Sequence, residues 1–238
     1  MKETLPATHL MRQFLLFVLV VLFLLLLLRA GHALWQFDAV KSMADSTGHP
    51  ERIFLTGLRF DLALIGLLCA VPVVLGPLLA MFEGTRWLAK WLVVLWLFGG
   101  LAFVLFTELL TPLFIVSAGE RPDAGAIADT AGLANLVRSA AARYPVPSAV
   151  ASLLVALILI AYLARMEIAR FLRYPLSRPS AILLAIVGGL LCVLAVRSEF
   201  TFVGQSLSHE AAVLGGPPVV DQLTMNSGWT TLQSLIPR

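Results

Sequence analysis

Long, nearly uninterrupted apolar runs alternate along the sequence with short polar segments. The hydrocarbon of a bilayer is about 30 Å thick, so a helix needs roughly 20 apolar residues to cross it with every backbone group paired. Five runs meet this requirement, at residues 13–35, 54–82, 87–116, 147–169 and 180–196. The pattern predicts an all-α, polytopic integral membrane protein with about five transmembrane helices, which together form a domain over residues 1–197.

Two of these runs carry residues that bear on helix position or packing. Arg29 lies near the end of the first run, where its side chain is expected to snorkel toward lipid headgroups beside Trp35. Gly188 and Gly189 in the last run permit close approach of another helix.

The first run has an alternative interpretation as a cleaved signal peptide. Basic residues precede it, and Gly31, His32 and Ala33 offer small residues near a cleavage position. The apolar run is longer than most signal-peptide cores, which favours a retained transmembrane helix.

The composition excludes a soluble catalytic domain and a nucleic-acid-binding function. Hydrophobic residues make up 59% of the 238 residues, charged residues 13%, and the mean hydropathy is +0.91. The net charge of +3 comes from basic residues beside apolar runs, where they orient helices and meet anionic lipid. Cys69 and Cys192 each lie alone in an apolar run and are expected to be free thiols.

Basic residues predict the orientation of the chain. The segments assigned to the inside of the membrane are short and dense in Lys and Arg: Lys2, Arg12, Arg86, Lys90, Arg165, Arg170, Arg173 and Arg178. By the positive-inside rule the N-terminus is cytoplasmic and the C-terminus is outside.

The outer segments are small. Leu133, Val137, Ala140 and Tyr144 recur at helical spacing, which indicates an amphipathic surface helix, with a plain solvated connector as the alternative. Residues 198–238 are too few for an independent core and are interpreted as an extracytoplasmic linker.

Three ionisable residues within the predicted spans form the candidate site. Arg59 and Asp61 lie near the start of the second span, and Glu108 lies near the end of the third. Helical rise places Arg59 roughly 8 Å and Glu108 roughly 12 Å below the outer surface, so the two are expected to pair, with Asp61 nearby. The cluster is either a structural ion pair or a site where Arg59 also meets a lipid phosphate.

No motif of a catalytic or metal site occurs in the sequence, which lacks GxSxG, P-loop and HExxH patterns. We therefore predict no catalytic residue and no cofactor in this chain. Thr107 and Thr111 are the best nucleophile candidates, but hydroxyls within helices usually bond to the preceding turn.

Three short stretches resemble the membrane half of the lipoteichoic acid synthase-like phosphoglycerol transferases. They are Gly-Leu-Arg-Phe-Asp-Leu at 57–62, Thr-Pro-Leu-Phe at 111–114 and Leu-Thr-Met-Asn at 223–226. Phosphoethanolamine transferases share the helix count but fit the stretch around Arg59 less well.

The resemblance implies that an extracytoplasmic domain of the sulfatase type, fused or separately encoded, carries out the chemistry. That domain would use a Thr nucleophile and a divalent metal to move glycerol phosphate from phosphatidylglycerol. This chain would anchor it in the cytoplasmic (inner) membrane of a bacterium and present outer-leaflet headgroups. The alternative is a stand-alone membrane protein, either an assembly partner or a small transporter, without enzymatic activity.

The orientation is testable by fusing a reporter that is active only outside the membrane to Arg238. We expect an active fusion, because an odd number of spans places the two termini on opposite sides. A fusion that is well expressed but inactive contradicts the five-span topology.

Overall fold

The computed structural model describes residues 7–141, 177–197, 207 and 209–235, and all regular structure in these ranges is helical. Within these ranges, four helices are long and apolar enough to cross a membrane: α1 (Ala7–Trp35), α3 (Arg52–Ala80), α4 (Arg86–Ala118) and α8 (Arg178–Arg197). They confirm the predicted helices at 13–35, 54–82, 87–116 and 180–196 and indicate a multi-pass membrane protein. The span predicted at 147–169 lies outside the described residues.

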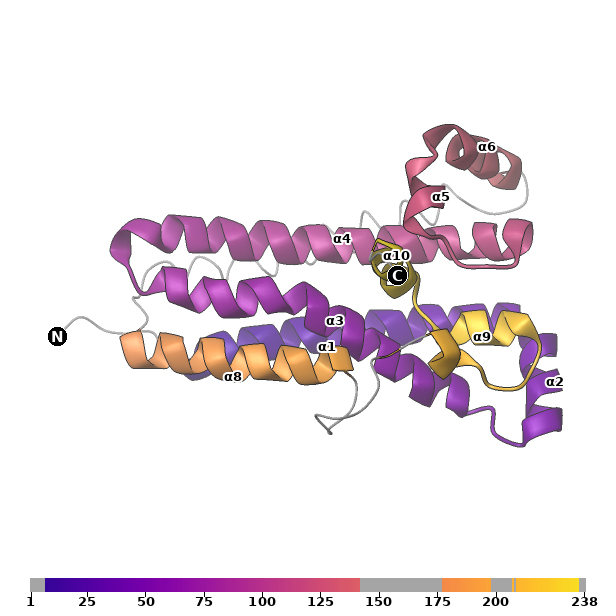
Figure 1. Cartoon of the computed structure of the whole chain (residues 1–238), viewed down its shortest axis with the longest axis horizontal. Coiled ribbons are helices and arrows are strands. Elements are labelled where there is room, and N and C mark those ends of the chain that lie inside the picture. The colour runs from indigo at the N-terminus through magenta and orange to yellow at the C-terminus, as the bar shows by residue number, and fades with distance from the viewer. Residues whose placement is uncertain (1–6, 142–176, 198–206, 208, 236–238) are drawn as a thin grey trace.

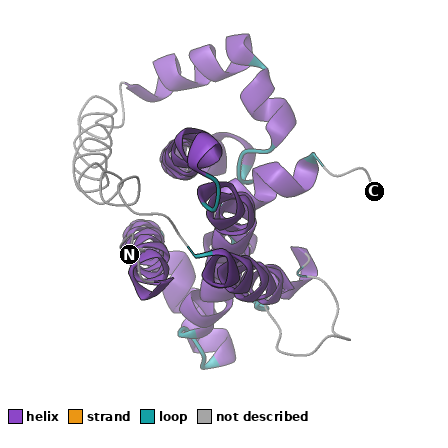
Figure 2. Ribbon diagram, turned by 90° about the vertical axis from the view of Figure 1, so that its left-hand side faces the viewer, coloured by secondary structure: helices purple, strands orange, loops and turns teal. Residues whose placement is uncertain are grey.

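Helix α3 is the centre of the bundle and runs antiparallel to its neighbours (Figures 1 and 2). At one end, Ala181 of α8 packs beside Phe14 of α1 and Met81 just after α3. At the other end, Arg29 of α1 meets Asp61 of α3. We call the first the N-terminal end and the second the capped end.

The contact between α3 and α8 depends on glycine. A Cβ on Gly66 of α3 would lie 2.8 Å from the carbonyl oxygen of Cys192 and from Ala195 Cβ. Gly188 and Gly189 of α8 lie against Val73 and Val74 in the same way. The predicted close approach at these two glycines is confirmed, because any side chain there would meet α3.

Apolar side chains from all four long helices fill the middle of the bundle. The buried members of this core are Val21, Leu25, Leu64, Ile65, Cys69, Leu101, Val104, Leu105 and Cys192. Both cysteines are free thiols, as expected.

Short helices gather at the capped end (Figure 1). They are α2 (Phe37–Thr47), α5 (Ala124–Ala128), α6 (Thr130–Ala141), α9 (Pro218–Thr224) and α10 (Ser227–Ser234). Helix α6 confirms the predicted amphipathic helix, since Leu133 and Val137 pack against Leu110 and Leu113 of α4. Tyr144 lies outside the described residues.

The described part of the C-terminal tail is folded into the bundle, and its role as an extracytoplasmic linker stays a prediction. Val220, Leu223 and Met225 are almost completely buried, and Val220 and Leu223 form a second core with Met43 and Ile53. The apolar residues of this tail are too few for a core of their own, but they form one by packing against α2 and α3.

Replacing Gly66 with Leu tests the α3–α8 contact. The larger side chain must push α8 away, so we expect the protein to lose about 1–3 kcal/mol of stability. Thermal unfolding of the detergent-solubilised protein measures this.

Gly99→Leu is the matched control, because a Cβ on Gly99 of α4 meets nothing within 4 Å. Equal melting temperatures for the two variants would contradict the close contact.

Candidate functional site

Two buried carboxylates define the site at the capped end. Asp61 of α3 is 1% exposed and Glu108 of α4 is 3% exposed. Both lie about two or three turns from the capped ends of their helices, which brings them to similar depth because the helices are antiparallel. In lipid, neither could be ionised without partners.

Arg29 of α1 is the cation on Asp61. Both terminal nitrogens of its guanidinium donate to the carboxylate, and Nη2 donates to Asp61 Oδ1 over 2.8 Å. Two planar groups paired in this way form one of the stronger protein ion pairs. Arg29 also donates to the carbonyl oxygens of Leu223 and Thr224, each over 3.3 Å.

Arg121, in the segment after α4, is the cation on Glu108. Its Nη1 donates to Oε1 over 2.9 Å and to Oε2 over 3.1 Å. Burial lowers the pKa of the Arg121 guanidinium, and Glu108 acts in the opposite direction. An arginine keeps its charge in a protein, so the pair is ionic.

The C-terminal segment joins the two ion pairs. Asn226 Nδ2 donates to Asp61 Oδ1 over 3.0 Å, and the backbone N–H of Ser227 donates to Glu108 Oε1 over 2.6 Å. The hydroxyl of Ser227 accepts a bond from Arg121 Nη1 over 2.8 Å and also bonds Thr111 Oγ1. Neighbouring residues of one segment thus bridge α3 and α4.

His32 is the one side chain of this cluster with an unsatisfied nitrogen. Its Nδ1 is buried, makes no hydrogen bond and lies 4.0 Å from Glu108 Oε2. That separation is too long for a direct hydrogen bond.

The structure brings Asp61 and Glu108 of the predicted cluster together, but each carboxylate pairs with an arginine other than Arg59. Glu108 pairs with Arg121 rather than with the expected Arg59, which lies half-buried on α3. Arg29 is 4% exposed, so it does not snorkel to the headgroups as expected. A carboxylate on the neighbouring helix holds it inside the bundle.

The threonines expected to bond within their helix do so. Thr107 Oγ1 donates to the carbonyl oxygen of Val104 over 3.0 Å, and Thr111 Oγ1 donates to that of Thr107 over 3.1 Å. No three His, Cys, Asp or Glu side chains gather as a metal site among the residues that the structure describes.

Sequence reasoning missed Arg29, Arg121, Asn226 and Ser227 as members of the site. A signal for Arg29 was present, because it follows an apolar run with no counter-charge of its own. The sequence carries no such signal for Arg121 or Ser227, since both lie in segments that resemble surface loops.

No family profile matches this sequence, and no solved structure matches the fold. The geometry of the site and the short sequence resemblance are therefore the basis for a functional proposal.

The buried pair of Arg29 and Asp61 is testable by a double-mutant cycle. Arg29→Gln should cost about 3–5 kcal/mol of stability, because it leaves a buried carboxylate without its cation. Arg29→Gln combined with Asp61→Asn should cost less than the sum of the two single changes. Denaturant titration of the purified protein measures all three.

Arg138→Gln on exposed α6 serves as the control and should change stability by less than about 0.5 kcal/mol. Strict additivity in the cycle would show that the two side chains do not interact.

Proposed function

We propose that this chain is the membrane module of a phosphoglycerol-transferase-like enzyme. It anchors the enzyme and presents outer-leaflet phospholipid headgroups, with phosphatidylglycerol as the expected lipid. The chemistry belongs to a sulfatase-type catalytic domain, fused or separately encoded, and the divalent metal belongs to that domain.

One observation carries the proposal: residues from all three resembling stretches meet in the polar cluster. Asp61 of the first stretch bonds Asn226 of the third, and Thr111 of the second bonds Ser227, which follows Asn226. Stretches so far apart in the sequence have no local reason to meet. Their convergence supports a shared architecture as the origin of the resemblance.

The position of the cluster suits the presentation of lipid headgroups. Trp35 and Phe37 are exposed near the junction of α1 and α2, as aromatic residues are at a membrane–water interface. Helix α10 lies beside α4, toward the same end of the bundle (Figure 1). A catalytic domain attached to α10 or bound beside it would be held close to the headgroups, which raises their effective concentration.

A second candidate, the stand-alone membrane protein, is favoured by the pairing of the cluster. Both carboxylates are neutralised by arginines of the same chain. Such internal neutralisation is what a purely structural cluster requires.

Reconstitution with the catalytic domain distinguishes these functions. The domain encoded after Arg238 or by a neighbouring gene is added to phosphatidylglycerol vesicles with and without this chain. We expect the chain to raise release of glycerol phosphate by about tenfold or more, because it concentrates the domain at the lipid. Hydrolysis of a soluble phosphodiester should not change.

Arg59 is the residue expected to meet a lipid phosphate, so Arg59→Gln should lower lipid turnover and leave the soluble reaction intact. Arg138→Gln should affect neither. If the chain itself does not change lipid turnover, the presenting function is wrong and the stand-alone protein is favoured.

A further inference from the structure

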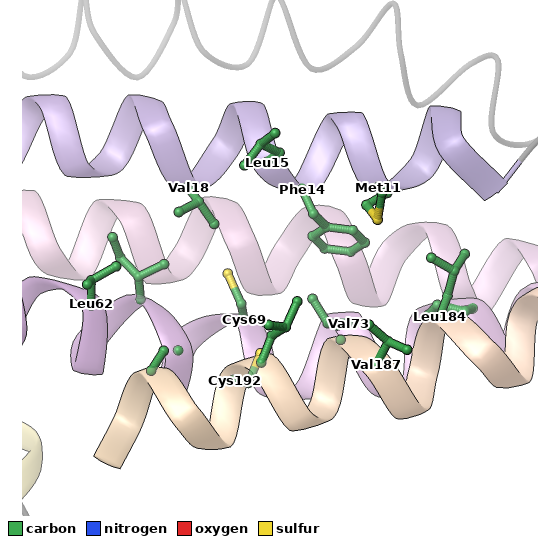
Figure 3. Close-up of a pocket in the computed structure, with 16 residues that line it drawn as sticks. Met11, Phe14, Leu15, Val18, Leu62, Cys69, Val73, Leu184, Val187 and Cys192 are labelled. Atoms are coloured by element: carbon green, nitrogen blue, oxygen red, sulfur yellow. The ribbon is translucent and has the colours of Figure 1, made fainter. Parts of the chain in front are cut away.

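An apolar groove runs between α1 and α8, with α3 as its floor (Figure 3). Its volume is about 280 Å³, and all sixteen residues that line it are apolar, glycine or cysteine. Phe14, Leu15 and Val18 form one wall, and Leu184 and Val187 lie on the other.

Among the described residues, the surface beside the groove is apolar, as a surface that faces lipid is. The flank of α8 beside it is strongly exposed, with Leu183 at 62% and Ile186 at 65%. Both α1 and α8 are candidate membrane spans. Within a bilayer, acyl chains are therefore the material available to fill the part of the groove that the described residues leave open.

The length of the groove matches an acyl chain. On α3 its lining extends from Leu62 to Pro77. Fifteen helical steps span about 22 Å. Half of the bilayer hydrocarbon is about 15 Å thick, so a complete chain of one leaflet fits along it.

Two exposed arginines lie close in sequence to the residues that line the N-terminal end of the groove. Met11 lines the groove there, and the next residue is Arg12, which is exposed. On α8, exposed Arg178 precedes the lining residue Leu184 by less than two turns. Neither arginine has an ion-pair partner within the described ranges, whereas nearby Arg86 pairs with Glu83.

Hydroxyl groups extend the same stripe of α8 beyond the apolar lining. Ser180 and Ser177 lie four and seven residues before Leu184, which is the same helix face. The Ser177 hydroxyl donates to that of Ser180 over 2.7 Å. The apolar stripe thus ends in hydroxyl groups at the N-terminal end of α8.

We infer that the groove binds one anionic phospholipid, with an acyl chain between α1 and α8 and the phosphate beside Arg12 and Arg178. This lipid belongs to the leaflet at the N-terminal end of the bundle. The inference does not depend on the proposed function, whose site lies at the capped end.

Lipid retention tests the inference. The full chain is purified from vesicles that contain phosphatidylserine, phosphatidylglycerol and phosphatidylcholine, and native mass spectrometry identifies the lipid that remains bound. We expect one lipid per chain, with either anionic lipid retained at least tenfold over phosphatidylcholine. Equal retention of both anionic lipids indicates recognition of charge.

Two variants locate the site. Val187→Trp should fill the groove and abolish retention, whereas Ile186→Trp, the adjacent lipid-facing position, should not. Arg12→Gln with Arg178→Gln should remove the preference for anionic lipid but keep a bound lipid, and Arg138→Gln at the capped end should change neither.

Several results would overturn the inference. They are no retained lipid on the wild-type chain, equal loss in the two tryptophan variants, and retention of phosphatidylcholine equal to that of the anionic lipids. A folded Val187→Trp protein, shown by an unchanged melting temperature, is required for its loss to count. If that variant unfolds, Leu191→Phe at the same rim replaces it, and continued retention in this variant overturns the inference.

Discussion

A carboxylate buried inside a helix bundle must be neutralised by the protein, and this constraint organises the capped end. Asp61 and Glu108 are on neighbouring antiparallel helices, and each holds its own arginine. Arg29 ties α1 to α3, while Arg121 draws the segment after α4 back onto the bundle. Removing any one partner leaves a charge that lipid cannot solvate. The relative depths of α1, α3 and α4 therefore depend on these pairs.

The same constraint explains why the C-terminal segment folds into the bundle. Two arginines and two carboxylates offer more donors and acceptors than they can satisfy among themselves. The carbonyl oxygens of Leu223 and Thr224 accept from Arg29, and the Ser227 N–H donates to Glu108. The segment thus supplies backbone groups where a water-filled site would supply solvent. Any domain attached to α10 would therefore be held beside this cluster.

Hydropathy and helical rise predicted the four described membrane helices and the similar depth of Asp61 and Glu108. They could not predict which arginine meets each carboxylate, because lateral neighbours depend on helix order and rotation. Arg29 resembled an interfacial residue because it lies near the end of its span. The tail resembled a linker because its apolar stretches are short. Its core forms only against α2 and α3, a long-range contact that periodicity does not report.

Helices α1 and α8 are attached to the central helix α3 by different kinds of contact. At the capped end, α1 is attached to α3 by an ion pair, whereas α8 is attached to α3 by the close contact at Gly66 and Gly188. Because both helices are fastened to α3 by different means, they need not pack tightly on each other along their middle. The apolar groove is the space that results. Protein groups complete the capped end, and an anionic lipid is the chemically matched group to complete the other.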